Sequence, residues 1–273
     1  MRPAAKQAVL LVNLGTPSAP TTRAVREYLL AFLGDPRVVA LPAWLWKPLL
    51  YTVIVPIRAK RSAKYYQSIW TAQGSPLVVY SKKLAIMVQD RLGEAFNVFL
   101  GMRYGEPSVH AVLSSLLQED SMIESLTILP LYPQYAGATT ASCFDVVNTV
   151  FKQHRFIRSL SLHCISSYFD NPLYIAALEK VIRHYWLAHG TNAYLLFSFH
   201  GLPKQAVKLG DPYEKQCYVT MDLLAKALNL LPEQYQLVLQ SRFEKGRDPN
   251  WDNTLIFLFS LSLSKQYLHY TIC

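Results

Sequence analysis

LLFSFHGLP, residues 195–203, joins a short and mostly apolar run to His200 and then to Gly201 and Pro203. A run of this length that ends at a glycine and a proline predicts a buried strand followed by a loop. Comparable apolar runs recur along the chain and alternate with longer stretches of helical period, which is typical of parallel α/β architecture. We therefore predict strands at residues 8–14, 96–102, 126–132, 158–165, 193–199 and 235–240.

Helix signals fill the segments between these strands. Thr21 or Thr22 can cap a helix that ends at Gly34, and Pro172 and Pro212 each follow a residue suited to capping. The character of the chain changes near 163–171, between two halves that each hold strands and helices. We expect helices at about 21–33, 60–69, 79–92, 107–118, 138–153, 172–188 and 212–229, arranged in two doubly wound α/β lobes at residues 1–163 and 164–273 with a cleft between them.

The composition is that of a folded globular protein. Of the 273 residues, 51% are hydrophobic and 16% are charged, whereas disorder requires low hydrophobicity. The formal charge of +9 is spread along the chain, which indicates either a basic surface or an anionic partner such as acidic lipid, a carboxylate-bearing ligand or nucleic acid, and charge alone does not choose between them. Four cysteines without a C-x-x-C pair favour a reduced, cytoplasmic protein without an iron–sulfur cluster.

One segment, residues 38–57, is apolar enough to suggest a membrane. It reads VVALPAWLWKPLLYTVIVPI, and its three prolines and Lys47 argue against a spanning helix. Two tryptophans beside a lysine suit a lip on a membrane surface or over an apolar cleft. A buried, proline-broken helical hairpin is the alternative.

Ligands of α/β folds bind outside the carboxyl ends of the strands, which directs attention to the loops that follow them. A neutral imidazole at His200 can accept a proton near pH 7 or bind a metal, although a structural, hydrogen-bonded histidine is the alternative. At the end of another strand, Arg103 can pair with a carboxylate and Tyr104 can pack on a flat ligand, unless they are an exposed arginine and a buried tyrosine. The loop at 129–142 lacks glycine-rich phosphate spacing, so nucleotide binding is poorly supported.

Five stretches are the most distinctive in the chain: LLVNLGTP, GMRYGEP, LPLYPQYAGATTAS, LLFSFHGLP followed by GDPYEKQC, and LVLQSRF. Together they resemble the motifs of the ferrochelatases, in the order of that family, from about residue 8 to about residue 243. The resemblance implies two similar chelatase-type lobes that hold a porphyrin and insert Fe²⁺ into its ring, with release of two protons. Protoporphyrin IX and ferrous iron would be the substrates, and neither a permanently bound cofactor nor a nucleic-acid partner is expected.

The resemblance also implies roles for single residues. His200 would be the catalytic residue and would contact the metal and the pyrrole nitrogens, while Arg103 and Tyr104 would line the opposite side of the pocket. The lip at 38–57 would receive a poorly soluble substrate, as in a cytoplasmic protein that contacts a membrane peripherally. The substrate-binding residues expected on this basis are Leu14, Arg103, Tyr104, Tyr132, Tyr135, Thr139 and Ser198.

The chain departs from the family pattern after LVLQSRF. The family continues with a tryptophan-containing loop, a strand and a helix whose glutamate faces the histidine, whereas this sequence from about 244 has no acidic residue after Asp252. We expect the second lobe to be incomplete at its C-terminal end and metal insertion to be impaired by loss of this glutamate. The alternative function is a non-catalytic porphyrin- or haem-binding protein that retains the pocket.

Overall fold

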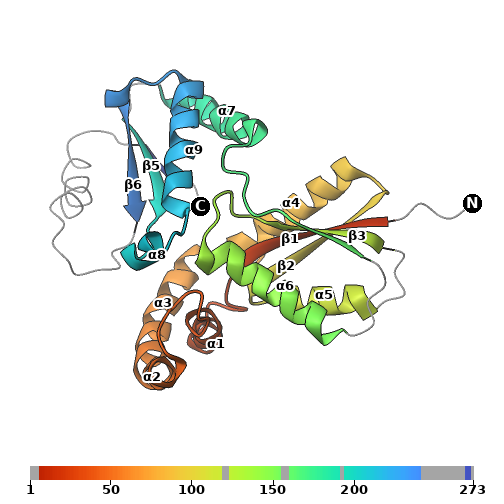
Figure 1. The fold of residues 1–273 in the computed structure, drawn as a ribbon. Coiled ribbons are helices and arrows are strands. Elements are labelled where there is room, and N and C mark those ends of the chain that lie inside the picture. Colours follow the sequence, from red (N-terminus) through yellow and green to blue (C-terminus); the bar gives the residue numbers. More distant parts are fainter. Residues whose placement is uncertain (1–5, 119–122, 155–159, 191–193, 241–267, 272–273) are drawn as a thin grey trace, which may run out of the picture. The chain divides into compact units, whose positions relative to one another are not determined.

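The computed structural model describes residues 6–118, 123–154, 160–190, 194–240 and 268–271. The chain forms two compact units, whose elements are labelled in Figure 1. Unit 1 comprises residues 1–132 and 137–166, and unit 2 comprises residues 133–136 and 167–273.

Unit 1 is built on a parallel four-stranded sheet in the order β2-β1-β3-β4. Its central strand β1 buries Leu10, Leu11 and Val12 completely, because it pairs with a strand on each side. The order of the strands reverses at β1, so the carboxyl end of this strand is the switch point at which ligands bind in such folds. The strands are β1 (Lys6–Gly15), β2 (Phe96–Tyr104), β3 (Ile123–Pro130) and β4 (Ser161–Cys164).

Helices cover both faces of this sheet, as Figure 1 shows. On one face lie α5 (Val109–Gln118) and α6 (Ser142–Gln153), the latter preceded by a π-helical turn, η2 (Gly137–Ala141). These helices and the strands share a core that includes Leu10, Leu113, Ile128 and Val147. On the other face lies α4 (Pro76–Leu92).

A separate helical cluster in unit 1 contains the lip. It consists of α1 (Thr22–Leu33), α2 (Ala43–Leu49), a π-helical turn η1 (Leu50–Ile54) and α3 (Val55–Ile69). Val25, Leu50 and Val55 are fully buried between α1 and the lip, whereas the outer face of this cluster exposes Leu41, Trp44, Leu45, Leu49, Tyr51, Val53 and Ile57. Residues 43–69 are helical without a break, because the residues at the junctions of α2, η1 and α3 all have right-handed helical dihedrals. The buried, proline-broken hairpin is therefore wrong, and this part of the segment belongs to one helix with a π-helical turn, a buried apolar face and an exposed apolar face. Among the described residues, no helix has both the length and the apolar character that crossing a membrane requires.

Unit 2 holds a parallel three-stranded sheet in the order β6-β5-β7. Residues 195–199 of the central strand are all buried, because strands flank it on both sides and two long helices pack against it. The strands are β5 (Leu195–His200), β6 (Tyr235–Gln240) and β7 (Leu268–Thr271). The helices are α7 (Pro172–His189), α8 (Lys204–Lys208) and α9 (Tyr213–Leu228), with a 3₁₀ turn, η3 (Pro232–Gln234).

The predicted α/β class with parallel sheets is confirmed. The six predicted strands overlap β1 to β6, and the predicted helices overlap α1, α3, α4, α5, α6, α7 and α9. The helices α2 and α8 and the strand β7 were not predicted. Residues 241–267, which include most of the atypical tail, lie outside the described residues.

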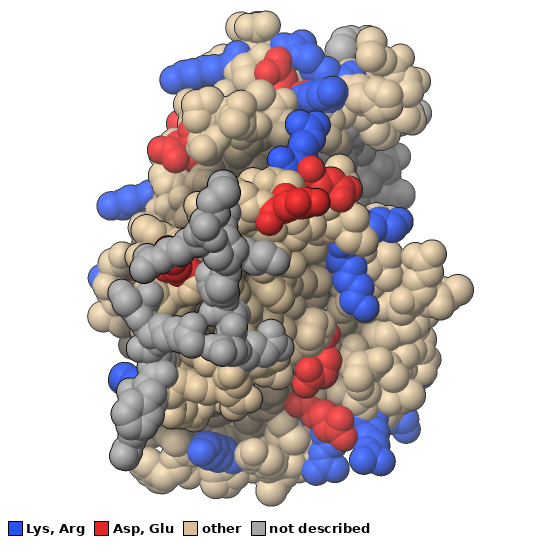
Figure 2. Space-filling model, turned by 90° about the vertical axis from the view of Figure 1, so that its right-hand side faces the viewer, with Lys and Arg blue, Asp and Glu red and all other residues tan. Residues whose placement is uncertain are grey.

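The basic excess of the sequence is dispersed over the face shown in Figure 2. Lysines and arginines occur there singly or in small groups, with acidic residues and large uncharged areas between them. The charge of +9 thus forms no continuous basic field on this face.

Candidate active site

A network of polar groups in unit 1 centres on Asp35. The Oδ2 atom of Asp35 accepts hydrogen bonds from Arg103 Nη2 at 2.5 Å, from Tyr104 Oη at 2.7 Å and from Ser142 Oγ at 2.6 Å. Its Oδ1 atom accepts from the backbone N–H of Arg37 at 2.7 Å. Asp35 is 7% exposed, so a nearly buried carboxylate receives four donors that surround both of its oxygens.

The local structure around Asp35 follows from the sequence. The helix α1 ends at Leu33, and Gly34 caps it through its backbone N–H. Asp35 follows this cap, and its carboxylate contacts the last two residues of β2. Arg103 and Tyr104 are the last two residues of β2, and Ser142 is the first residue of α6. The network therefore joins a helix end, a strand end and a helix start at the carboxyl side of the sheet.

The charges of this network balance one another. Burial alone would raise the pKa of Asp35, but the hydrogen bonds from Ser142, Tyr104 and Arg37, with the charge of Arg103, outweigh burial and lower this pKa. The Asp35 carboxyl is therefore ionised at neutral pH and compensates the guanidinium of Arg103. This guanidinium also donates from Nε to Ser142 Oγ at 2.6 Å and lies 4.4 Å from the centre of the Tyr104 ring.

Close backbone contacts fix the loops around this network. Gly15, at the end of β1, has a φ of 100°, and a Cβ atom there would overlap the carbonyl oxygen of Tyr104. The side chain of the neighbouring Asn13 donates to Ser81 Oγ of α4 at 3.0 Å. Leu14, between them, is half-buried at the switch point of the sheet.

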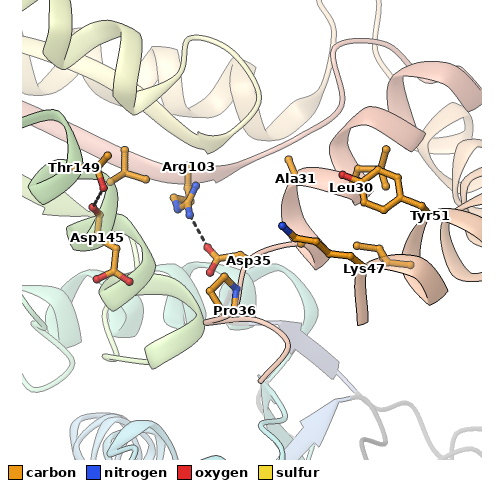
Figure 3. A pocket seen from close by; sticks show the side chains of 12 residues that line it. Leu30, Ala31, Asp35, Pro36, Lys47, Tyr51, Arg103, Asp145 and Thr149 are labelled. Atoms are coloured by element: carbon orange, nitrogen blue, oxygen red, sulfur yellow. Dashed lines mark hydrogen bonds and ion pairs between the residues drawn. The ribbon is translucent and has the colours of Figure 1, made fainter. Parts of the chain in front are cut away.

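An open cavity of about 460 Å³ adjoins the network and is shown in Figure 3. Its volume lies in the range of about 300–1,000 Å³ that is typical of small-molecule sites. Asp35 and Arg103 belong to its wall, and the lip contributes Lys47, Leu50 and Tyr51. The remaining lining residues come from the end of α1, the residues after it and α6: Leu30, Ala31, Gly34, Pro36, Asp145, Val146 and Thr149.

The loop between β3 and α6 contributes further candidates. Burial raises the pKa of the Tyr132 hydroxyl well above its ordinary value, so this group stays protonated. Tyr135 and Thr139 are half-buried, and the backbone N–H of Tyr135, in unit 2, donates to Gln216 Oε1 at 2.7 Å. Neighbouring Thr140 is completely buried, and its hydroxyl has no hydrogen-bond partner among the described residues. The π-helical turn η2 that holds both threonines is a distortion that occurs often at functional sites.

His200 ends the central strand of unit 2. The five preceding residues are buried, whereas His200 is exposed at the carboxyl end of β5. Partial desolvation lowers its pKa from the ordinary value of 6.5, so the imidazole is neutral at pH 7. A neutral imidazole can accept a proton or offer a lone pair to a metal ion. Ser198, two residues earlier, is 2% exposed and points to the opposite side of the strand from its neighbours.

The structure brings only some of the expected residues together. Arg103 and Tyr104 share one network in unit 1, and Arg103 reaches the cavity, whereas Tyr104 is 2% exposed. His200 and Ser198 lie in unit 2. Sequence reasoning missed Asp35 and named Lys47 only as part of the lip. The Gly34–Asp35 step after a helix was a visible signal, but nothing in the sequence placed it beside a strand end 68 residues later.

The described cysteines are dispersed and free. Cys143 lies in the core of unit 1, Cys164 at the end of β4 and Cys217 in the core of unit 2. Burial raises the pKa of the Cys143 thiol to about 12, which leaves it protonated and unreactive. No group of three histidine, cysteine or acidic side chains suited to a metal ion occurs within the described part of the chain. The absence of an iron–sulfur cluster stays a prediction.

Comparison with known proteins gives a consistent result. The model of the family described as Ferrochelatase matches residues 6–256. The chain is 50% identical over 246 residues to a ferrochelatase of Edwardsiella ictaluri, an alignment that covers 90% of this chain and 74% of that protein. It is 44% identical over 262 residues to a ferrochelatase of Vibrio parahaemolyticus, covering 95% and 80% of the two chains. A ferrochelatase of Methylococcus capsulatus is 46% identical over 246 residues, covering 89% and 73%.

Proposed function

The chain belongs to the ferrochelatase family, and we propose from this that it is a porphyrin metal chelatase that converts protoporphyrin IX and Fe²⁺ into protohaem. Two pyrrole N–H bonds break, two protons leave, and the ring nitrogens bind the ion, so the reaction needs no oxidant or reductant. The observation that carries the proposal is the family match over residues 6–256 together with identities of 44–50% over about nine-tenths of the chain or more.

The chemistry of His200 suits removal of the pyrrole protons. Desolvation lowers the pKa of the imidazole, so the ring is neutral at pH 7 and can accept a proton. A cationic imidazole would repel Fe²⁺, and the neutral form avoids this cost. We assign to His200 the role of accepting a pyrrole proton and contacting the incoming metal ion.

Three of the remaining predicted residues lie at the ends of strands of unit 1. Leu14 stands half-buried at the switch point of the sheet and can pack on a macrocycle. Arg103 forms part of the cavity wall, and Tyr104 holds Arg103 in place through its ring and through Asp35. The other residues proposed to bind the substrate are Tyr132 and Thr139 in unit 1 and Tyr135 and Ser198 in unit 2.

Metal insertion by a His200→Ala variant tests this function. Loss of porphyrin fluorescence is followed with Fe²⁺ under anaerobic conditions and with Zn²⁺ as a substitute. Because a positioned general base contributes about 10²- to 10⁴-fold, we expect the rate to fall by at least about 100-fold while porphyrin affinity changes little. His163→Ala, which removes an exposed histidine from β4, is the control. Metal insertion that survives His200→Ala would refute the role of His200, and tight porphyrin binding without insertion by the unaltered chain would favour a binding protein.

The exposed face of the lip supports peripheral membrane contact. Trp44 is 79% exposed and Ile57 is 68% exposed, next to an α3 surface that carries Arg58, Lys60, Arg61 and Lys64. Apolar side chains beside cations suit the interface of an anionic membrane. We therefore propose a cytoplasmic protein that contacts the membrane through this lip.

Sedimentation with anionic phospholipid vesicles tests the membrane contact. Trp44→Glu should abolish co-sedimentation, because it places a negative charge in the contact. Leu187→Glu is the matched control, since Leu187 is an 86% exposed apolar residue on α7. Equal vesicle binding by both variants would contradict the assignment.

A further inference from the structure

The charged side chains that line the cavity of unit 1 cancel one another. Among the described residues of its wall, the acidic ones are Asp35 and Asp145 and the basic ones are Lys47 and Arg103. Figure 3 shows Arg103 and Asp35 pointing toward each other, with Asp145 and Lys47 on either side of them. These residues therefore give the wall no net formal charge, although it holds several charged groups.

The Asp35–Arg103 pair is the most deeply buried part of this arrangement. Its side chains are 5% and 18% exposed, and Ser142 Oγ donates to the carboxylate and accepts from Arg103 Nε, each at 2.6 Å. Asp145 is 48% exposed and pairs at 2.7 Å with Arg37, which is not among the lining residues. Because a charge acts more strongly where water is excluded, a ligand would respond most to an imbalance in the buried pair.

The charge of this wall matters for the proposed reaction. Metal insertion brings a divalent cation to the porphyrin and releases two protons, so the species that move are all cations. A guanidinium without a counter-charge would repel them. The Asp35 carboxylate offsets this repulsion and leaves the guanidinium in place, 4.4 Å from the centre of the Tyr104 ring.

We propose that Asp35 is a positioning residue for metal insertion, which holds the Arg103 guanidinium in the cavity wall and cancels its charge toward the incoming Fe²⁺. The inference rests on the proposed function, since it takes the ligand of the cavity to be a porphyrin that receives a metal ion. Asp35 acts through Arg103 and is not itself a ligand of the ion, because four donors already surround its two oxygens.

A double-mutant cycle on this pair tests the inference. KM for Zn²⁺ is measured with the full chain at saturating porphyrin and low ionic strength, for the unaltered chain, Asp35→Asn, Arg103→Met and the double variant. Asp35→Asn leaves one positive charge in excess, Arg103→Met leaves one negative charge in excess, and the double variant is neutral again. Glu27→Gln, which breaks an exposed ion pair with Arg23 on α1, is the control.

We expect KM for Zn²⁺ to rise about threefold to tenfold in Asp35→Asn, the size expected for one partly screened charge acting on a divalent ion. It should fall in Arg103→Met and return to the unaltered value in the double variant. Added salt should reduce these differences, because it screens the excess charge. Glu27→Gln should leave KM unchanged.

The KM for the porphyrin separates lost charge balance from lost structure. A distorted cavity would raise the KM of both substrates. In contrast, the excess positive charge of Asp35→Asn does not repel a carboxylate-bearing porphyrin, so KM for the porphyrin should not rise.

The cycle remains decisive if Asp35→Asn is too unstable to purify. Arg103→Met and the double variant still differ in the charge at residue 35, so KM for Zn²⁺ should be lower in Arg103→Met. Removing both partners of a buried ion pair also costs less stability than removing one, which favours folding of the double variant.

Two results would overturn the inference while leaving the proposed function intact. One is a KM for Zn²⁺ that does not depend on the charge at residue 35 in either background. The other is a rise in Asp35→Asn that persists in the double variant and at high salt, since this would reflect lost structure. An unaltered chain that inserts no metal ion would instead refute the proposed function, and the inference with it.

Discussion

Asp35→Asn tests the network in unit 1 most directly, because it keeps the shape of the side chain and removes its charge. In the native protein Oδ2 accepts three side-chain hydrogen bonds and Oδ1 accepts one from the backbone. An asparagine offers one acceptor oxygen, so its NH₂ group must face at least one donor. The guanidinium of Arg103, 18% exposed, also loses its counter-charge.

The magnitude follows from the burial of this pair. Removing one partner of a buried ion pair costs about 3–5 kcal/mol, and the Ser142 contacts of Arg103 place the expected loss near the lower end, at about 3 kcal/mol. Asp145→Asn breaks the Arg37–Asp145 pair, whose side chains are 47% and 48% exposed, and should cost less than about 1 kcal/mol. Urea denaturation of both variants measures the two free energies of unfolding.

The pH dependence gives a second check on the same variant. The folded-state pKa of Asp35 is lowered, so its contribution to stability is complete above the ordinary pKa of 3.8 and is lost as pH falls through the lowered value. The stability difference between the native chain and Asp35→Asn should therefore shrink below about pH 4. Equal losses from Asp35→Asn and Asp145→Asn, or a difference independent of pH in this range, would refute the reasoning.

Two further predictions concern the ends of the central strands. Because desolvation lowers the pKa of His200 below 6.5, the acid limb of the kcat/KM profile for metal insertion should lie below pH 6.5, and a limb centred above that value would contradict a neutral His200 as the base. Gly15→Ala should destabilise the chain by at least about 2 kcal/mol in urea, because the new Cβ meets the Tyr104 carbonyl at a positive φ. Gly93→Ala meets no atom within 4 Å, so only the strain of its φ of 68° and ψ of −164° opposes it, and it should cost about 1–3 kcal/mol and less than Gly15→Ala. Equal losses at both glycines would contradict the steric argument.

Local sequence patterns predicted most of the fold. The strands β1 and β5 are central in their sheets, and both of their faces are covered. Their apolar runs are therefore continuous, whereas a strand with one face in water alternates apolar and polar residues. The capping threonine before α1 and the proline at the start of α7 marked those helices correctly. In contrast, α2 contains Pro48, which argued against a regular helix, and the four-residue strand β7 falls in a tail without a clear pattern. The domain limits of 1–163 and 164–273 stay a prediction.

The candidate site was less predictable because its contacts are long-range. Ligands of α/β folds bind at the carboxyl ends of the strands, and this rule identified His200, Arg103 and Tyr104 as candidates. All three do lie at the carboxyl ends of β5 and β2. The same rule could not show that Arg103 is compensated, since its partner Asp35 belongs to a helix end far away in sequence.

The Asp35 network has a consequence for the order in which unit 1 folds. Asp35 meets Arg103, Tyr104 and Ser142 across 68, 69 and 107 residues of chain, so none of these bonds forms until β2 and the start of α6 have reached the end of α1. Contacts that close such long loops are costly early in folding and form late. Substitution of Asp35 should thus leave the folding rate almost unchanged and accelerate unfolding, which makes this carboxylate a determinant of how long the native state persists.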